Sequence, residues 1–460
     1  MKTIWDKYHY DRKIIDEFLA AFEIKVQGAA EPINWKNTLS KILVWDGFNM
    51  DLKYDYSTLI QNRKTGYLKP IAKFIIKFFK KKSHLNDIIF PHTLKQSKIL
   101  FFLKNRGEAE ILLPLLNGLY QKTDFAIVYE HDDTKELYKP FEFIKLNTLS
   151  FGEIKIGFGI KKIPNNKSMF VLNNFLNEQA NLEKYLSFFT HLKTHNNALK
   201  KVVFVAGENK YAANLCHQVF KNTLVKTENL MNGAKYGWPN DADVDFDTWY
   251  VWNEKMKLFL NENAKVPAEI LKVVGHPLEH QIKNHKYSNK NNALNQFQRQ
   301  FDIIVTLFST SLQFEKKFTI YKMVIDFVKQ NPKMGLIIKA HQSDKEVSFF
   351  NPYKDDSQIS FFEGFSKNLL LDIINVSQVT LSFGSTVSFE SIWMGVPNIS
   401  YEEAPKSLLP IEGELFYHIN KEEELIPKLQ QILNEVDKSK VQSNTMTSVV
   451  EKYVDFIVGC

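Results

Sequence analysis

Short runs of apolar residues alternate with helical patterns over the middle of the chain. Strands are predicted where an apolar run is continuous, and helices where apolar residues recur every three or four positions. Strands are predicted in this part at residues 98–103, 125–129, 169–172, 201–206, 249–252 and 271–274. Continuous apolar strands separated by helices are typical of a parallel sheet that is covered on both faces. We therefore expect an α/β domain over residues 96–277.

The alternation stops at residues 278–300, which are polar and rich in asparagine, and then resumes. We interpret this segment as a linker. Further strands are predicted at residues 301–308, 335–340, 379–383 and 398–401, with helices between them and over 421–458. A chain of 460 residues is too long for one ordinary core and suits two domains of about 200 residues each. The expected fold class is α/β, with two Rossmann-like domains in tandem, the second over residues 301–460, and an active site in the cleft between them.

Residues 1–95 have a less regular pattern and are interpreted as an accessory segment of the first domain. Residues 41–45 (KILVW) predict a short buried strand. Residues 70–82 predict an amphipathic helix with an apolar stripe on one face and lysines mostly opposite. We favour packing of this stripe on the first domain. The alternative is a peripheral anchor on the cytoplasmic face of the inner membrane, where the lysines would meet anionic lipid.

Charge and cysteine content narrow the class of protein. The formal net charge is +7, which suits an acidic substrate or an anionic surface. Basic and stacking aromatic residues form no recognised nucleic-acid module, so no nucleic acid partner is expected. The two cysteines are far apart and form no CxxC pair, which favours a reducing compartment. Because neither a signal peptide nor an 18-residue apolar window is found, we expect a cytoplasmic protein.

The turn Gly384-Ser385-Thr386 joins a predicted strand to a predicted helix. Ligands of parallel sheets bind beyond the carboxyl ends of the strands, so this turn is a candidate site. Gly384 lets the backbone approach a ligand closely, and the two hydroxyls suit a phosphate group. Glu390, about one helical turn further on, could accept hydrogen bonds from ribose hydroxyls. The alternative for Ser385 is a simple N-cap.

Two histidines also follow predicted strands. His341 comes directly after the strand at 335–340, and Lys339 lies two residues before it. Both side chains could neutralise phosphate charge, although a structural role is the alternative. His276 lies in a Gly-His-Pro turn, which is typical of a hinge bordering the cleft. We include Lys339, His341 and His276 among the candidate residues that would bind a phosphate-bearing ligand.

The first domain offers carboxylates that could act as general bases. Glu108 and Glu208 each follow a predicted strand, and either is a candidate base for an acceptor hydroxyl, with Asp46 as a third. Each glutamate could instead be a first-turn residue favoured by the helix dipole. The candidate residues of the cleft loops are Arg106, Asn232, Gly233 and Lys235.

Four aspartates, Asp241, Asp243, Asp245 and Asp247, invite interpretation as a metal site. The segment lacks the central glycine and the terminal glutamate of an EF-hand loop, so we expect a solvated loop instead. No metal site is predicted, and the chemistry is expected to be independent of metal. The GxGxxG, GxxxxGK[ST], GxSxG and HExxH motifs are all absent, and no cofactor is expected.

Several short motifs resemble those of the bacterial surface-polysaccharide transferases of GT-B architecture. This group includes Kdo-transferase-like proteins and the CDP-glycerol glycerophosphotransferases. In the first domain, Asn232-Gly233-Ala234-Lys235-Tyr236-Gly237 corresponds to the group's His-Gly-x-x-x-Gly, Trp252-Asn253-Glu254 to its W-x-E, and Val273-Val274-Gly275-His276-Pro277 to its V-V-G-x-P. In the second domain, Lys339-Ala340-His341-Gln342 corresponds to the group's K-x-H-P. Ser385-Thr386 with Glu390 corresponds to S-T-x-x-x-E, and Gly395-Val396-Pro397 to G-x-P. Two departures are Asn232, where the group usually has histidine, and Gln342 in place of proline.

The resemblance implies a glycosyltransferase that moves a sugar from a nucleotide-activated donor to a growing surface polysaccharide or glycolipid. It also implies that His341, Ser385, Thr386 and Glu390 bind the donor nucleotide, and that a saccharide or lipid-linked saccharide is the acceptor. The nucleotide-sugar is then a substrate and not a cofactor. One alternative is a nucleotide-sugar 2-epimerase of the same architecture. The other, suggested by Asn232, is a catalytically inactive binding protein.

Overall fold

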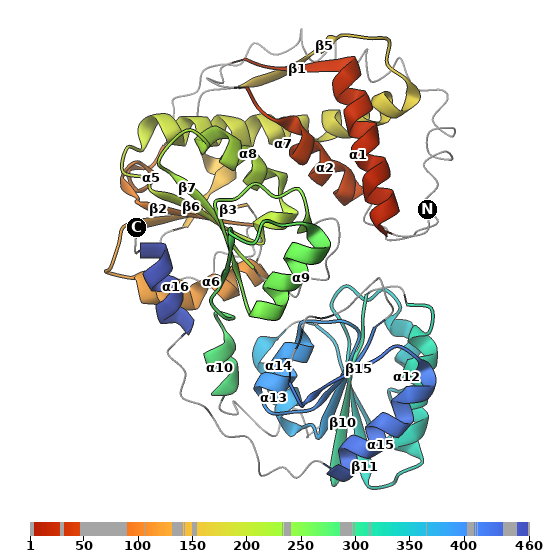
Figure 1. The fold of residues 1–460 in the computed structure, drawn as a ribbon. Coiled ribbons are helices and arrows are strands. Elements are labelled where there is room, and N and C mark those ends of the chain that lie inside the picture. Colours follow the sequence, from red (N-terminus) through yellow and green to blue (C-terminus); the bar gives the residue numbers. More distant parts are fainter. Residues whose placement is uncertain are drawn as a thin grey trace. The chain divides into compact units, whose positions relative to one another are not determined.

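The computed structural model describes residues 4–27, 32–46, 90–104, 106–130, 141, 143–149, 154–231, 233, 241–285, 297, 300–311, 314–364, 366–402, 409, 411, 413–435 and 449–458. The chain forms two compact units. Unit 1 comprises Met1–Asn232, Gly237–Val274 and Val450–Cys460, and unit 2 comprises Gly233–Tyr236 and Gly275–Val449. Each unit contains its own parallel sheet (Figure 1).

Seven parallel strands form the sheet of unit 1, in the spatial order β4-β3-β2-β6-β7-β8-β9. They are β2 (Ile99–Leu103), β3 (Phe125–Tyr129), β4 (Phe143–Lys145), β6 (Lys201–Val205), β7 (Lys226–Leu230), β8 (Thr248–Val251) and β9 (Leu271–Val273). The chain runs outward from β2 to β4, returns to the centre at β6 and then runs to the other edge, which is the Rossmann order. All residues of β2 and β6 are buried, as expected for central strands covered on both faces.

The helices around this sheet are α5 (His92–Gln96), α6 (Arg106–Leu119), α8 (Tyr211–Phe220), α9 (Glu254–Ala264) and α16 (Val449–Val458), with short 3-10 turns η2 (Leu146–Thr148) and η3 (Gly207–Asn209). Helix α16 packs on unit 1 through Tyr453, whose ring lies 5.6 Å from that of Tyr250. Lys201 also donates a hydrogen bond of 2.8 Å to the carbonyl of Phe456. The last segment of the chain is therefore grouped with unit 1, whereas the sequence analysis places it in the second domain.

A further layer of unit 1 is built from α1 (Ile4–Ala21), α2 (Trp35–Asp46) and the long α7 (Asn166–His195). An antiparallel pair of strands, β1 (Phe22–Gln27) and β5 (Lys155–Ile160), flanks these helices (Figure 1). The layer has its own apolar core, which includes Ile14, Phe18, Leu39, Phe175 and Leu186. The N-terminal helices are therefore an integral part of unit 1.

Six parallel strands form the sheet of unit 2, in the order β12-β11-β10-β13-β14-β15. They are β10 (Ile303–Phe308), β11 (Met334–Lys339), β12 (Ile359–Phe362), β13 (Val379–Ser382), β14 (Asn398–Tyr401) and β15 (Phe416–Ile419). This is again the Rossmann order, and it reverses between β10 and β13.

Helices cover both faces of this second sheet (Figure 1). The first face carries α12 (Lys317–Lys329), α15 (Leu425–Glu435), η5 (Val347–Tyr353) and η6 (Glu422–Glu424), and the second carries α10 (Glu279–Lys283), α13 (Lys367–Val376) and α14 (Val387–Trp393). Val324 and Leu429 belong to the core on the first face, and Ile374 and Val387 to the core on the second.

Two predicted strands are wrong, because both segments are helical. Residues 41–45 lie in α2, and residues 169–172 lie in α7. Leu39, Ile42 and Leu43 are buried at the spacing of one helix face, and α7 buries its apolar residues in the same way. An apolar run of four or five residues is common to buried strands and buried helices, so it does not distinguish them.

The acidic segment at residues 241–247 is also not the solvated loop that the sequence predicts. Asp243 forms an ion pair of 2.9 Å with Arg12 and accepts a hydrogen bond of 2.6 Å from Ser40. Asp245 accepts one of 3.0 Å from Asn37. The segment therefore fastens α1 and α2 to the rest of unit 1. Among the residues that the structure describes, no three metal-binding side chains gather.

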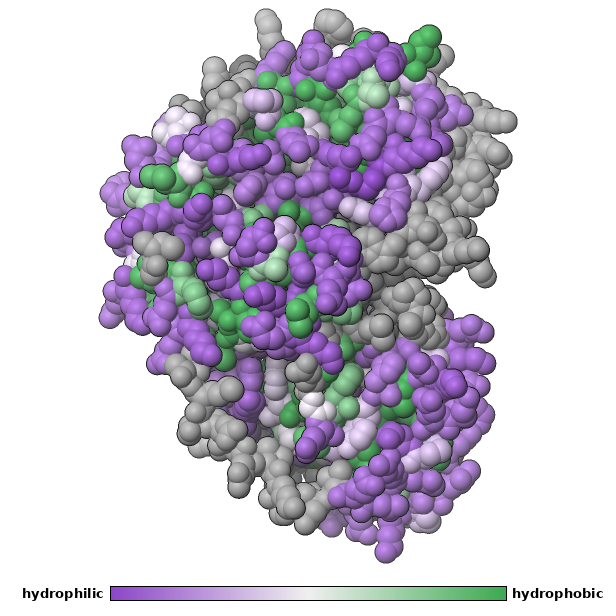
Figure 2. All heavy atoms as spheres, viewed as in Figure 1, coloured by the Kyte–Doolittle hydropathy of each residue, from purple (hydrophilic) through white to green (hydrophobic). Residues whose placement is uncertain are grey.

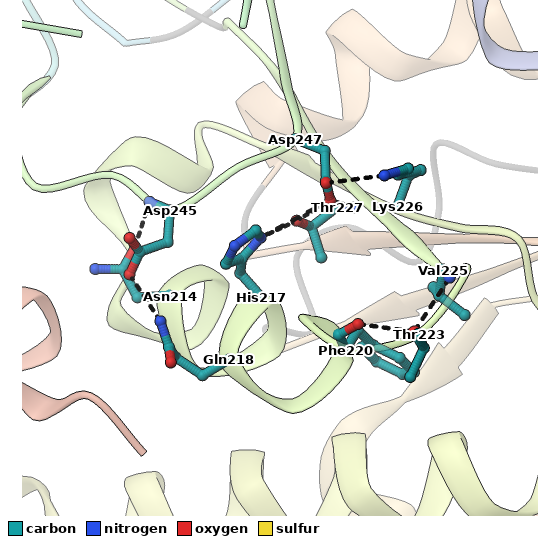
Figure 3. Close-up of polar contacts among 10 residues, drawn as sticks. All are labelled: Asn214, His217, Gln218, Phe220, Thr223, Val225, Lys226, Thr227, Asp245 and Asp247. Carbon is teal, nitrogen blue, oxygen red and sulfur yellow. Dashed lines mark hydrogen bonds and ion pairs between the residues drawn. The ribbon is translucent and has the colours of Figure 1, made fainter. Parts of the chain in front are cut away.

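Asp247, at the end of the same segment, joins it to α8 (Figure 3). Its carboxylate accepts hydrogen bonds from the backbone amide and the hydroxyl of Thr227, at 2.8 and 3.0 Å. The hydroxyl of Thr227 lies 2.6 Å from Nδ1 of His217. These contacts lower the pKa of Asp247, although desolvation opposes them.

The predicted helix at residues 70–82 lies outside the described residues. No described helix is both long and apolar enough to cross a lipid bilayer.

Candidate functional site

The candidate site of unit 2 lies where its strand order reverses. β10 pairs with β11 on one side and with β13 on the other, and all three run in the same direction. Their carboxyl ends therefore meet at one edge of the sheet. Strands in a sheet are about 4.8 Å apart, so the loops after β11 and β13 begin about 10 Å from each other. A split between diverging loops of this kind is the usual ligand site of a Rossmann sheet.

The turn after β13 has a fixed backbone. Gly384 adopts a left-handed conformation with φ of 53°, which favours glycine. Its amide donates a hydrogen bond of 3.1 Å to the hydroxyl of Ser400. Behind it, the carbonyls of Ser385 and Thr386 accept hydrogen bonds of 3.0 Å from Ser388 and Phe389 at the start of α14. Ser385 and Thr386 are half-buried.

His341 follows β11 and is held by two backbone contacts. Its own amide donates to the hydroxyl of Ser309, the residue after β10, at 3.0 Å. The amide of Ser343 donates to Nδ1 of the ring at 3.1 Å. Nδ1 is therefore the acceptor, and the proton of the neutral ring is on Nε2.

His341 is exposed as a residue, yet desolvation by the surrounding protein lowers the pKa of its ring. Asp344 opposes this shift, and Lys339 and Lys317 reinforce it. The ring can consequently offer a hydrogen-bond donor without carrying a positive charge.

An ion pair between Lys317 and Asp344 is connected to the backbone of His341. The hydroxyl of Ser309 donates to Asp344 at 2.7 Å. Lys317, which is 1% exposed, lies 3.1 Å from Asp344 and 2.9 Å from Glu346. Ser309 thus links the His341 backbone to an ion pair, and the loop after β11 is fixed to α12.

Glu390 lies on α14 and its buried carboxylate forms an ion pair with Lys367, the first residue of α13. His276 lies near the same lysine, and burial followed by the Lys367 charge lowers its pKa to about 3. The ring of His276 packs at 5.0 Å from that of Trp393, and its Nδ1 accepts a hydrogen bond from Leu278. Glu390 and His276 are thus two buried side chains of unit 2 that both interact with the half-buried Lys367.

The ammonium of Lys339 contacts two backbone carbonyls. It donates hydrogen bonds of 2.6 Å to the carbonyl of Gly364 and 3.0 Å to that of Ala340. Desolvation lowers its pKa, with Glu363 acting in the opposite direction. The side chain therefore fastens the end of β11 to the loop after β12.

The two candidate bases of unit 1 lie at the corresponding edge of its sheet, after β2 and β6. Glu108 forms a buried ion pair of 2.6 Å with Lys210 and accepts a hydrogen bond of 2.7 Å from the amide of Lys104. Desolvation raises the pKa of Glu108, and Lys210 opposes the shift. Glu208 is fully buried and accepts a hydrogen bond of 2.7 Å from Asn229.

Five other candidates are described only in part or not at all. Gly233 is grouped with unit 2, and a Cβ placed on it would lie 3.8 Å from Oγ1 of Thr386. Asn232 and Lys235 lie outside the described residues, as do the side chains of Arg106 and Asp46.

Sequence reasoning did not identify Ser309, Lys317, Asp344, Lys367, Lys210 or Asn229. Ser309 could have been found, because it directly follows the predicted strand at 301–308 and so falls under the same strand-end rule as His341. The others are recognisable only from their partners in space.

No protein-family model matches the sequence, and no curated protein matches it. Solved structures do share its fold. The UDP-GlcNAc 2-epimerase of Methanocaldococcus jannaschii, solved with UDP-GlcNAc and UDP, has a TM-score of 0.53 and 14% identity over 79% of this chain and 99% of that chain. The Neisseria meningitidis UDP-GlcNAc 2-epimerase bound to UDP-GlcNAc has a TM-score of 0.52 and 12% identity over 78% and 93%. S. aureus MnaA with UDP has a TM-score of 0.54 and 14% identity over 79% and 96%.

At these identities the likeness establishes the fold. The predicted class, two Rossmann-like α/β domains in tandem as in GT-B proteins, is confirmed.

Proposed function

We propose that this protein is a glycosyltransferase that uses a nucleotide-activated sugar as donor and a surface polysaccharide or glycolipid as acceptor. The observation that carries the proposal is that His341 and the Ser385–Thr386 turn follow the two strands that flank β10, at the reversal point of the unit 2 sheet. Structures of the same fold hold UDP or UDP-GlcNAc. We therefore propose a UDP-sugar as the first donor to test.

In the proposed complex, His341 donates a hydrogen bond from Nε2 to an oxygen of the donor diphosphate, and the hydroxyls of Ser385 and Thr386 donate to others. The bond between the anomeric carbon and the diphosphate oxygen breaks, and negative charge grows on that oxygen. Donors already fixed in place stabilise this charge more than they stabilise the intact donor, which lowers the barrier.

The acceptor hydroxyl forms the new bond to the anomeric carbon and loses its proton. We propose that Glu108 or Glu208 receives this proton. Glu108 is the better candidate, since desolvation raises its pKa and makes it a stronger base. We also propose that the transfer needs no metal ion, so activity should persist in excess EDTA. Activity that is lost in EDTA and restored by Mg²⁺ or Mn²⁺ would contradict this part of the proposal.

The second candidate function is inversion at C2 of a nucleotide-sugar. It is favoured by one observation, the likeness of fold to the two UDP-GlcNAc 2-epimerase structures reported above, whose TM-scores exceed 0.5. The two activities differ in what they consume, because epimerisation converts the donor without an acceptor, whereas transfer releases the nucleotide.

The test is product analysis with UDP-GlcNAc, preceded by a thermal-shift panel with UDP, CMP, CDP and GDP to choose the nucleotide. Release of free nucleotide with a lengthened saccharide supports the transferase. Conversion of the donor to its C2 epimer without acceptor supports the epimerase. Nucleotide binding with neither product supports an inactive binding protein, and binding of no nucleotide contradicts all three.

A further inference from the structure

The turn between β5 and α7 exposes two isoleucines to solvent. Ile160 is 68% exposed and Ile163 is 96% exposed, which are high values for large apolar side chains. Lys161 and Lys162, which lie between them, are exposed as well. Figure 2 shows hydrophobic atoms protruding from unit 1 beyond the β1–β5 pair. Large apolar side chains left outside a core in this way are typical of contact surfaces.

The backbone of this turn is firmly held, so the isoleucines cannot simply fold back. Ile160 is the last residue of β5 and pairs with Phe22 of β1. The amides of Lys161 and Lys162 both donate to the carbonyl of Ala21, at 2.8 and 3.2 Å. The other end of the turn is fixed by Asn165, whose side chain caps α7 and donates to Glu17 at 2.9 Å.

The two lysines of the turn keep their positive charge available. Neither forms an ion pair with another residue that the structure describes. Two acidic side chains on the neighbouring elements α1 and β1 already have basic partners: Glu17 with Lys167 at 3.8 Å, and Glu23 with Lys25 at 3.4 Å. The tip is therefore both apolar and cationic.

We propose that the tip Ile160-Lys161-Lys162-Ile163 docks on an anionic lipid surface. The isoleucines would enter the boundary between headgroups and acyl chains, and the ammoniums would meet lipid phosphates. The tip lies on a two-stranded pair and offers only two apolar side chains, which is too little area for a stable protein interface of roughly 1,200 Å² or more. The proposal does not depend on the proposed enzymatic function or on the segment at 70–82.

The test is flotation of the full-length protein with phosphatidylcholine vesicles that contain or lack phosphatidylglycerol, at low and high salt. Two double variants are compared with the parent: Ile160→Ser with Ile163→Ser, and Lys161→Gln with Lys162→Gln. Leu224→Ser is the matched control, because Leu224 is 95% exposed in a different turn of unit 1. Thermal unfolding of each variant confirms that it is folded, as expected for changes at exposed positions.

We expect the parent to float with anionic vesicles, less so at high salt, and each double variant to float at least about five-fold less. The Leu224 variant should float like the parent. Flotation of both double variants at the level of the parent would place the contact elsewhere and overturn the proposal. Failure of the parent to float at low salt would overturn it as well, as would equal loss in the Leu224 variant.

Discussion

The amide of Ser343 donates a hydrogen bond of 3.1 Å to Nδ1 of His341, and this bond determines which ring nitrogen faces a ligand. Since Nδ1 accepts, Nε2 carries the proton of the neutral ring. Desolvation lowers the pKa of His341 below its usual value of 6.5, so the neutral ring dominates at physiological pH. The site is thus built to donate a hydrogen bond at His341, and not to supply a cation.

The first prediction concerns the turnover of the donor. His341→Ala should lower kcat by about 10- to 100-fold and leave KM little changed, because the lost hydrogen bond strengthens as charge grows on the leaving group. In the parent, the His341 ring should impose no rise in kcat as the pH falls from about 8 to about 6.5, because the neutral form is the active one. Steady-state kinetics over this range check both statements. A rise toward acid pH that disappears in His341→Ala would show that the imidazolium is required.

The second prediction concerns the nucleotide. Glu390→Ala should weaken nucleotide binding by about 1–3 kcal/mol, since ribose hydroxyls would lose a buried acceptor. Calorimetric titration with the tightest-binding nucleotide measures the change. Lys367→Met is the companion variant, because it leaves the carboxylate in place and removes its ion-pair partner. Unchanged affinity in Glu390→Ala would mean that Glu390 serves only to hold Lys367.

The third prediction separates a buried from an exposed lysine on the same helix. Lys317→Met should destabilise unit 2 by about 3–5 kcal/mol, because the buried Asp344 would lose its cation. Lys322→Met removes an exposed pair with Asp326 and should cause no measurable change. The free energies of unfolding of the two variants are compared by urea denaturation, with hydrogen exchange of the β10 and β11 amides as the probe. Equal stability of the two variants would contradict the supporting role assigned to Lys317.

The sequence predicts those elements whose pattern of apolar residues is visible within a few consecutive positions. The central strands, such as β2 and β6, were predictable because continuous apolar runs are needed where both faces of a sheet are covered. Strand β1 alternates exposed with buried or half-buried residues, and β5 is mostly half-buried. The two form an antiparallel pair outside both parallel sheets, so no rule for parallel strands detects them. Helix α2 was missed because its apolar run is too short to show its period.

Some residues of the candidate site are also predictable from the sequence, and others are not. His341 and the Ser385–Thr386 turn were predictable, because each directly follows a strand. Asp344 and Lys317 were not, because the contact that gives them a role joins residues 27 positions apart. The ion pair of Glu108 with Lys210 is likewise a contact between distant parts of the chain, so the sequence does not reveal it.

The fourth prediction concerns pH and His276. Its pKa falls to about 3 in the folded chain, against about 6.5 when unfolded. The unfolded chain therefore takes up a proton as the pH falls below 6.5 while the folded chain does not, so stability is present above pH 6.5 and is lost toward acid pH. Between pH 7 and pH 5 this group should cost unit 2 about 2 kcal/mol. His276→Gln should flatten that slope in urea unfolding, and an identical slope in the variant and the parent would contradict the assignment.

The central claim is that a nucleotide diphosphate binds at the reversal point of the unit 2 sheet. The measurement that tests it most directly is a crystal structure of the protein with UDP, or with whichever nucleotide stabilises it most. We expect the phosphates within hydrogen-bond distance of Nε2 of His341 and of the hydroxyls of Ser385 and Thr386. A nucleotide bound elsewhere, or at this edge without contact to His341, would contradict the account.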